Sequence, residues 1–196
     1  MYKLTEWFQS KDIQITEGYS QLCEQKSNFL KNIVQDKSIK NVMEIGFNGG
    51  HSAEIFLSSN PDIQLTSFDI GQHSYVSVGK EYIDNTFPNR HTLILGNSLE
   101  TVPKYIKNNN IKFDIIYIDG GHTYDIAKGD LLNCKQLAHS KTIVIMDDTI
   151  EKTEWICPWT EGPTSAWKEA QNMNFIQQTG FEEYSEGQGN SWGFYK

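Results

Sequence analysis

The sequence predicts a single α/β domain whose doubly wound sheet has seven strands, mostly parallel, and closes with an antiparallel hairpin. Three observations predict it. Apolar runs rich in β-forming residues recur along the 196 residues, segments with helical spacing lie between them, and the closing stretch has the pattern of a hairpin. Strands that alternate with helices form right-handed crossovers and a parallel sheet with helices on both faces. The expected architecture is therefore Rossmann-like.

Five apolar runs are expected to be the parallel strands. They lie at residues 40–46, 63–70, 91–96, 112–119 and 141–148. The last two runs are almost continuously apolar, as central strands buried on both faces require. The closing stretch FEEYSEGQGNSWGFYK has two strand-like segments around a Gly/Asn turn, which predicts an antiparallel hairpin at the edge of the sheet.

Helices are expected before, between and after these strands. An apolar stripe from Tyr19 to Val34 predicts a helix over about residues 16–35 that packs on the domain. Helical spacing recurs after the fourth strand, on a face formed by Ala127, Leu131, Cys134 and Ala138. Thr123 is placed to cap that helix. A last helix is expected over roughly 164–178, after a loop rich in Trp and Pro.

The composition narrows the class of protein and of partner. Hydrophobic residues make up 38% and charged residues 21% of the chain, which fits a soluble globular protein. The formal charge of −8 argues against nucleic acid or an anionic membrane as a partner. The N-terminus lacks the apolar core of a signal peptide. The three cysteines lie far apart and form no Cys-x-x-Cys pair, so we expect reduced thiols and a cytoplasmic location.

The first candidate ligand site follows the first strand, in VMEIGFNGGHSAEIFL (42–57). Ligands of open α/β sheets bind outside the carboxyl ends of the strands, near the point where strand order reverses. A dinucleotide fingerprint would need glycine at the first, third and sixth positions from Gly46, but Asn48 and His51 stand at the third and sixth. This argues against a nicotinamide-dependent oxidoreductase, which remains an alternative. His51 is expected to begin a helix, and His73, His91 and His139 are expected to lie on the surface.

This stretch, together with the acid that ends TSFDI (66–70) and with GNS (96–98), resembles the class I S-adenosylmethionine-dependent methyltransferases. The resemblance implies S-adenosylmethionine as methyl donor. Glycine would let the backbone lie against the methionine part, and an acid such as Glu44 suits its ammonium group, directly or through water. Asp69 lies where doubly wound proteins place a carboxylate for the ribose hydroxyls, and Ile70 would face adenine.

The candidate donor-binding residues are Glu44, Gly46, Phe47, Asn48, Gly49, Gly50, Ser52, Asp69, Ile70, Asn97, Ser98 and Asp119. The competing interpretation is that the glycines only make a tight turn and that Asp69 is a solvated strand end.

The second candidate site lies where the fourth and fifth strands end. Asp119 ends the fourth strand in IYIDGGHTYD, and Asp147 and Asp148 end the fifth. Neighbouring parallel strands would bring the three carboxylates to one edge of the sheet, where like charges repel each other. A hard cation such as Mg²⁺, or Ca²⁺ or Mn²⁺, would compensate them. Alternatively, Asp119 belongs to the donor pocket alone, and Asp147 and Asp148 cap backbone amides.

Residues 113–149 are similar to a subgroup that includes metal-dependent sugar O-methyltransferases of antibiotic biosynthesis. This resemblance implies a metal ion on Asp119, Asp147 and Asp148, with His122 as the catalytic base beside Asp119. Catechol-type relatives have Asp-Asn where this chain has Asp147-Asp148, so they are less similar. In the competing interpretation His122 is a structural hydrogen-bonding residue at a helix start.

The expected activity is methyl transfer from S-adenosylmethionine to a hydroxyl of a small molecule, a sugar or a phenolic metabolite. Mg²⁺ is an optional second cofactor of this reaction. A donor-binding protein without turnover is the other alternative. One domain (1–196) would comprise a helical segment (1–38), a donor-binding core (40–150), an aromatic loop or lid (151–163) and a helix with the hairpin (164–196). Trp155 and Trp159 are expected to cover the acceptor, to pack in the core or to meet a second subunit of a homo-oligomer.

Overall fold

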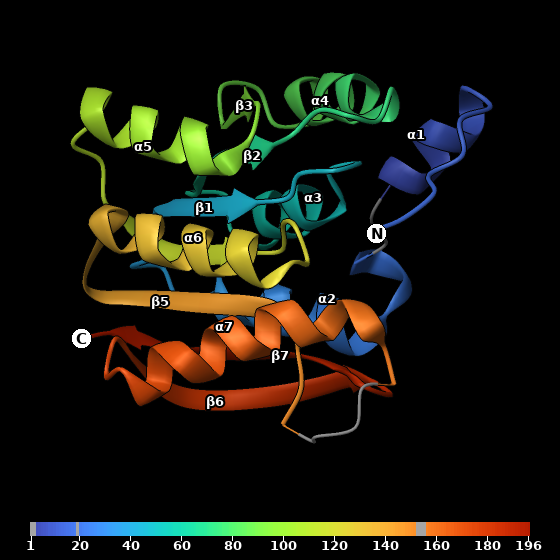
Figure 1. Cartoon of the computed structure of the whole chain (residues 1–196). Helices are drawn as coiled ribbons and strands as arrows, with labels where there is room; N and C mark the ends of the chain where they lie inside the picture. The colour runs from blue at the N-terminus through green and yellow to red at the C-terminus, as the bar shows by residue number, and fades with distance from the viewer. Residues whose placement is uncertain (1–2, 19, 152–155) are drawn as a thin grey trace.

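The computed structural model describes residues 3–18, 20–151 and 156–196, and its helices and strands alternate as predicted (Figure 1). The strands are β1 (Asn41–Ile45), β2 (Gln64–Asp69), β3 (His91–Leu95), β4 (Phe113–Ile118), β5 (Ala138–Thr149), β6 (Ile176–Ser185) and β7 (Gln188–Tyr195). The helices are α1 (Leu4–Ser10), α2 (Glu24–Ile33), α3 (His51–Ser59), α4 (Tyr75–Thr86), α5 (Ser98–Asn108), α6 (Tyr124–Cys134) and α7 (Glu161–Asn172), with the 3₁₀ turns η1 (Ser20–Leu22), η2 (Lys135–Leu137) and η3 (Pro158–Thr160).

The sheet has seven strands in the order β3-β2-β1-β4-β5-β7-β6. β1 to β5 pair in parallel, whereas β7 pairs antiparallel with both β5 and β6. The predicted fold, a mostly parallel sheet with a C-terminal antiparallel hairpin at its edge, is confirmed. The strand order reverses between β1 and β4, which places the expected ligand crevice above these two strands.

Helices cover both faces of the sheet and enclose two hydrophobic cores. α5, α6 and α7 lie in front of the sheet in Figure 1 and bury side chains such as Val102, Leu131 and Trp167 against it. The opposite face carries α2, α3 and α4, with Leu30 and Phe56 in the core. Among the described residues, no helix has both the length and the apolar composition needed to cross a bilayer.

The register aligns the strand ends at one edge of the sheet. Ile45 pairs with Phe68 of β2 and with Ile118 of β4, and Ile118 pairs with Met146 of β5. The residues that follow these four are Gly46, Asp69, Asp119 and Asp147, which are therefore brought to one edge.

The acids of β5 lie inside the strand, because β5 runs to Thr149. The β5–β7 pairing shifts register between Met146 and Thr149, and Asp148 has a positive φ of 52°. Successive residues of a regular strand point to opposite faces. The irregularity changes that alternation at the acidic pair, as bulges do where a sheet must redirect a side chain.

Several predicted helix boundaries were wrong. The helix expected over 16–35 is divided into η1 and α2, while the seven-residue α1 was not predicted. α7 begins at Glu161 and ends at Asn172, earlier than expected, since Pro163 is accepted in its first turn. Thr123 is the N-cap residue of α6, but its side chain makes no capping hydrogen bond.

α1 is held in place by a buried acid of α3. Glu54 accepts hydrogen bonds from the backbone amides of Lys3 (2.8 Å) and Leu4 (3.3 Å), and from the Tyr82 hydroxyl (2.6 Å). The Glu54 carboxylate thereby satisfies backbone amides that the first turn of a helix leaves unpaired. Contacts between residues this far apart leave no periodic pattern in the sequence, which explains why α1 was missed.

Candidate active site

A cleft of about 830 Å³ lies above the carboxyl ends of β1 to β4. Gly46, Asp69, Asn97 and Asp119 line it from the ends of these strands or the loops after them. The remaining wall comes from the N-terminal segment around α2 and from the C-terminal hairpin, for example Tyr184. The cleft is therefore at the predicted switch point and joins distant parts of the chain.

The loop after β1 depends on close backbone packing. Gly46 has a φ of +100°, and a Cβ at this position would lie 1.8 Å from the carbonyl oxygen of Asp119. Only glycine permits the backbones to approach this closely. Asn48, also at positive φ, donates its backbone N–H to Asp69 Oδ2 at 2.7 Å. Both residues line the cleft, as expected for a loop that lies against a ligand.

Asp69 is fixed by two backbone amides. Asn48 N–H donates to Oδ2 and Gly71 N–H donates to Oδ1, each at 2.7 Å. A carboxylate oxygen has a second lone pair, so Asp69 can also accept hydrogen bonds from a ligand. The next residue, Ile70, is 63% exposed and lines the cleft, which gives the cleft an apolar surface beside this acid.

Asn97 and Ser98 also line the cleft, at the start of α5. The Asn97 side chain caps this helix, because its Oδ1 accepts the backbone N–H of Leu99 at 3.0 Å. The amide nitrogen of Asn97 belongs to the same exposed side chain. The two predicted residues are thus placed beside Asp69 and Ile70 at the cleft wall.

Glu44 lies beneath the cleft rather than in its wall. Its side chain is fully buried, and its carboxylate accepts hydrogen bonds from the hydroxyls of Ser52 and Ser67, both at 2.6 Å. Burial raises the pKa of Glu44 to about 7. The predicted direct contact with a ligand's ammonium group does not fit this geometry. Of this group, Ser52 lines the cleft.

Three other predicted donor-binding residues contribute mainly to the support of the loop. Phe47 lines the cleft but is only 1% exposed, and its ring stacks on His91 at 5.0 Å between centroids. Gly49 and Gly50 are buried and lie outside the cleft lining. His51 is the first residue of α3, as predicted.

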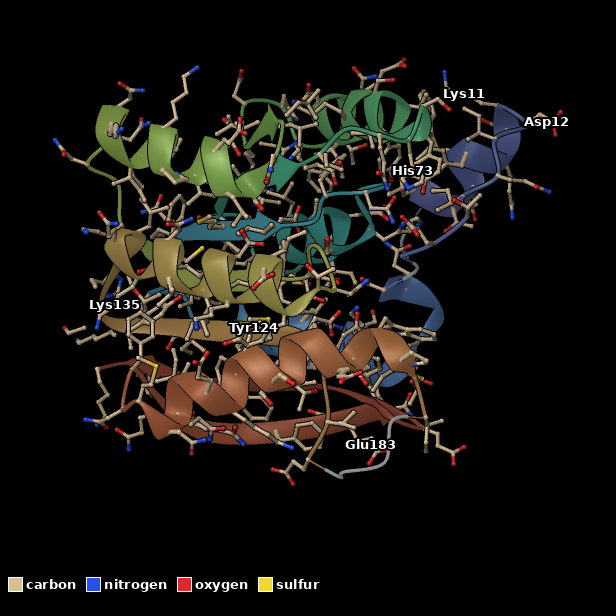
Figure 2. All side chains as sticks on the ribbon, viewed as in Figure 1. Lys11, Asp12, His73, Tyr124, Lys135 and Glu183 are labelled. Atoms are coloured by element: carbon tan, nitrogen blue, oxygen red, sulfur yellow. The ribbon has the colours of Figure 1, made fainter. Side chains whose placement is uncertain are left out.

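The prediction that His91 lies on the surface was wrong. His91 is 9% exposed, and its Nε2 is 2.8 Å from the Ser67 hydroxyl. Burial lowers its pKa to about 3, so the ring is neutral near pH 7. His73, labelled in Figure 2, lies near the N-terminal segment, with its Nε2 2.7 Å from Glu17 Oε1. His73 and Glu17 line the cleft, whereas His91 does not.

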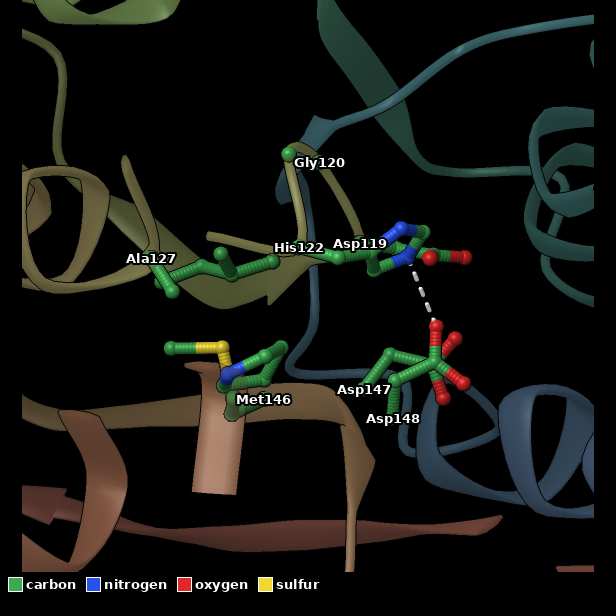
Figure 3. Close-up of a pocket in the computed structure, with 10 residues that line it drawn as sticks. Asp119, Gly120, His122, Ala127, Met146, Asp147 and Asp148 are labelled. Carbon is green, nitrogen blue, oxygen red and sulfur yellow. Dashed lines mark ion pairs between the residues drawn. The ribbon is translucent and has the colours of Figure 1, made fainter. Parts of the chain in front are cut away.

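Asp119, His122, Asp147 and Asp148 converge at the ends of β4 and β5 (Figure 3). His122 Nε2 lies 2.9 Å from Asp148 Oδ2, the ion pair drawn in the figure. This hydrogen bond raises the pKa of His122 above its usual value, although burial opposes it. The imidazole remains accessible, since its side chain is 46% exposed. The predicted acidic edge and its histidine are therefore brought together.

A lysine compensates part of this negative charge. Lys26 of α2 forms an ion pair with Asp147 and lies 3.2 Å from Asp119 Oδ2. Its side chain is 11% exposed and that of Asp147 is 1% exposed. Burial by itself would lower the pKa of Lys26, but Asp119, Asp147 and Asp148 outweigh it and raise that pKa above its ordinary value. Lys26 is therefore a buried ammonium ion.

Two tyrosines complete the hydrogen bonding of the acids. Tyr117 donates its hydroxyl to Asp119 Oδ2 (2.9 Å) or Asp147 Oδ2 (3.0 Å). Tyr184 of β6 lies with its hydroxyl 2.9 Å from Asp147 Oδ1 and 3.0 Å from Asp148 Oδ1. Burial, together with the charge of Asp147, raises the pKa of Tyr184, so its proton stays available for these bonds.

The predicted metal ligands do not fit an ion as a set. Asp147 faces Lys26, Tyr117 and Tyr184. Because Lys26 supplies positive charge, the buried carboxylates do not need a metal ion to compensate them. Another group of three, Asp119, His122 and Asp148, offers ligand atoms within 4.8 Å of one another. A metal ion there would compete with the hydrogen bond between His122 and Asp148.

The residues missed in the sequence are Lys26, Tyr117 and Tyr184. Lys26 carried a signal, since it lies four residues after Leu22 and four before Leu30, on the predicted apolar stripe. Neither tyrosine differs in sequence from an ordinary strand residue. Trp159 lines the cleft and is 46% exposed, so it is not packed in the core. Trp155 lies outside the described residues.

Comparisons with solved structures support this fold. An O-methyltransferase from Bacillus cereus, solved in complex with SAH, has a TM-score of 0.75 at 17% identity, over 99% of this chain and 90% of that chain. TomG of Streptomyces achromogenes, an O-methyltransferase solved with SAM, has a TM-score of 0.71 at 14% identity, over 99% and 88%. A TDP-rhamnose 3'-O-methyltransferase of calicheamicin biosynthesis has a TM-score of 0.64 at 17% identity, over 96% and 91%.

The sequence comparisons give the family. None of the curated proteins compared with the chain matches it. The methyltransferase domain family matches residues 43–149, which span β1 to the end of β5 and hold the strand ends described above. This match covers more than half of the chain, so the chain belongs to the methyltransferase domain family.

Proposed function

We propose that this methyltransferase transfers the methyl group of S-adenosylmethionine to a hydroxyl of a small molecule, a sugar or a phenolic metabolite. The observation that carries the proposal is that one cleft joins Asp69 and the Gly46 loop to the His122–Asp148 pair. The similarity to O-methyltransferases supports the choice of oxygen as acceptor. The net charge of −8 favours a small acceptor over nucleic acid or an anionic membrane.

The donor fits the half of the cleft above β1 to β3. Its methionine part would lie along the Gly46 backbone, where a side chain would collide with the β4 end. Asp69, held by two amides, has lone pairs left for the ribose hydroxyls. Ile70 would pack on the adenine, and Asn97 and Ser98 would face its edge.

The acceptor would lie between the donor methyl group and His122. An alcohol is a weak nucleophile until its proton is removed, and imidazole accepts protons near neutral pH. When Nε2–H of His122 donates to Asp148, Nδ1 is free to accept that proton. The acceptor oxygen then forms a bond to the methyl carbon, the carbon–sulfur bond breaks, and its electron pair returns to sulfur to give S-adenosylhomocysteine.

Without Asp147, a divalent ion such as Mg²⁺ would have Asp119, His122 and Asp148 as its candidate ligands. Such an ion, when bound, would lower the pKa of a coordinated acceptor hydroxyl. His122 cannot use the same nitrogen for the ion and for Asp148. Because Lys26 already compensates Asp147, we assign the proton transfer to His122 and propose that turnover does not require the ion.

The test is a panel of sugars and phenols incubated with S-adenosylmethionine, with and without EDTA, in which S-adenosylhomocysteine and methylated product are measured by mass spectrometry. We expect at least one hydroxylated acceptor to be methylated at equal rates in both. Loss of turnover in EDTA, with recovery on adding Mg²⁺, would show that a metal ion is required. Binding of NADH in place of the donor would favour an oxidoreductase, and donor binding without any product a non-catalytic protein.

A further inference from the structure

Lys26 is a buried residue of the site whose role the proposed function leaves unexplained. This lysine comes from α2, outside the segment that the methyltransferase family matches, yet its ammonium group meets the acids that end β4 and β5. It also lies over the Tyr184 ring, 5.2 Å from the centroid. Burying a lysine is costly unless it is paired, and here the pairing involves the carboxylates of the candidate site.

The contacts around Asp147 leave little space for another cation. Its Oδ2 faces both Lys26 and the Tyr117 hydroxyl, and its Oδ1 faces the Tyr184 hydroxyl. A metal ion bound by Asp147 would have to displace these donors and would be repelled by the ammonium group. Of the described residues that line the cleft, Lys26 is the only lysine or arginine.

Asp119 is the acid through which Lys26 reaches the cleft. Its Oδ2 is held by Lys26 at 3.2 Å and Tyr117 at 2.9 Å, which leaves Oδ1 for other partners. Asp119 lines the cleft at the point where the proposed donor half meets His122. Lys26 and Tyr117 together therefore set the direction of the Asp119 carboxylate.

We propose that Lys26 is the resident cation of this site: it pairs with Asp147, positions Asp119 at the cleft, and takes the place that a divalent ion would need at Asp147. This proposal rests on the proposed function for its catalytic meaning. Lys26 is a positioning residue, because it acts through Asp119, and Asp147 serves as its counter-ion. The N-terminal segment thereby supplies a positive charge to the acids at the ends of β4 and β5.

The experiment measures Mn²⁺ binding by electron paramagnetic resonance, on the whole chain saturated with S-adenosylhomocysteine and without acceptor. The variants are Lys26→Met, Asp147→Asn, the double variant Lys26→Met/Asp147→Asn, and Lys31→Met as a control on the exposed side of the same helix. We expect wild type and Lys31→Met to bind Mn²⁺ only weakly and with the same affinity as Asp147→Asn. Lys26→Met should bind Mn²⁺ at least tenfold more tightly than wild type does. The double variant Lys26→Met/Asp147→Asn should lose this gain in affinity.

A role of Lys26 in packing alone would lower the melting temperature without creating a metal site, so equal Mn²⁺ binding by Lys26→Met and Lys31→Met would overturn the proposal. Mn²⁺ bound by wild type and lost in Asp147→Asn would overturn it too. If Lys26→Met does not fold, the charge-balanced double variant still tests the pairing. Its melting temperature should lie closer to that of wild type than the melting temperature of Asp147→Asn does. A melting temperature below that of Asp147→Asn would contradict the pairing. No acceptor is needed, so failure of the proposed methyl transfer would not affect this result.

Discussion

The two halves of the cleft are built in different ways. In the donor half, Asp69 is held by the backbone amides of Asn48 and Gly71, and Gly46 sets how closely two strands approach. In the acceptor half, side chains hold one another across long sequence separations, as Lys26 and Asp147 do over 121 residues. A half built from backbone depends on the fold, whereas a half built from side chains depends on individual residues. Substitutions should therefore affect the two halves separately.

The largest separation is expected from His122→Ala. Loss of a general base lowers kcat by about 10²–10⁴-fold, while the affinity for S-adenosylhomocysteine should stay within about twofold, because Asp69 and the Gly46 loop are unchanged. Steady-state kinetics and calorimetry measure the two quantities. His139→Ala is the matched control, since His139 also lies beside an acid, 3.0 Å from Asp114. Full turnover in His122→Ala would show that another group accepts the proton.

The second prediction concerns stability in the acceptor half. Asp147→Asn removes one partner of a buried ion pair and should lower the free energy of unfolding by about 3 kcal/mol. Asp62→Asn removes the partner of Lys40 from an exposed pair and should cost much less, because solvent screens the attraction between exposed charges. Urea unfolding of both variants measures the difference. Equal losses would mean that the Lys26–Asp147 pair contributes no more than a surface pair.

The third prediction concerns pH and the support beneath the donor half. His91 has a pKa of about 3 in the folded chain and an ordinary value near 6.5 when unfolded. Below pH 6.5 the unfolded chain therefore binds a proton that the folded chain does not, and stability falls as the pH falls. At pH 5 the loss should approach about 2 kcal/mol. His91→Gln lacks this loss.

Thermal unfolding of wild type and His91→Gln at pH 7.5 and pH 5 checks this sign. Relative to wild type, His91→Gln should be more stable at pH 5 than at pH 7.5, whatever the difference between the two proteins is at pH 7.5. Other buried groups, such as His51, titrate alike in both proteins and cancel. Parallel pH dependence of the two proteins would mean that His91 is protonated as readily in the folded chain as in the unfolded one.

The smallest expected effect comes from Asn97→Ala, which removes the side-chain cap of α5. Loss of an N-cap costs about 1 kcal/mol, measurable by urea unfolding. Because Asn97 also lines the cleft, we expect a modest loss of donor affinity, with kcat unchanged at saturating donor. A large fall in kcat would place Asn97 in the chemistry and weaken the division between the two halves.

The same contrast explains what could be predicted from the sequence. Strand ends follow from apolar runs, and the register then carries Asp69, Asp119 and Asp147 to one edge. The partners of these acids do not follow, because the chain distance between Lys26 and Asp147 leaves no local pattern. The burial of Glu44 and His91 was missed for a similar reason: Ser67, which contacts both, lies on the neighbouring strand.

The donor half is expected to bind S-adenosylmethionine independently of the acids beside it. Calorimetric titration of S-adenosylhomocysteine into wild type, Asp69→Ala and His122→Ala tests it most directly. We predict one site in wild type, at least a tenfold weaker site in Asp69→Ala, and wild-type affinity in His122→Ala. No binding to wild type, or equal binding by wild type and Asp69→Ala, would contradict the account.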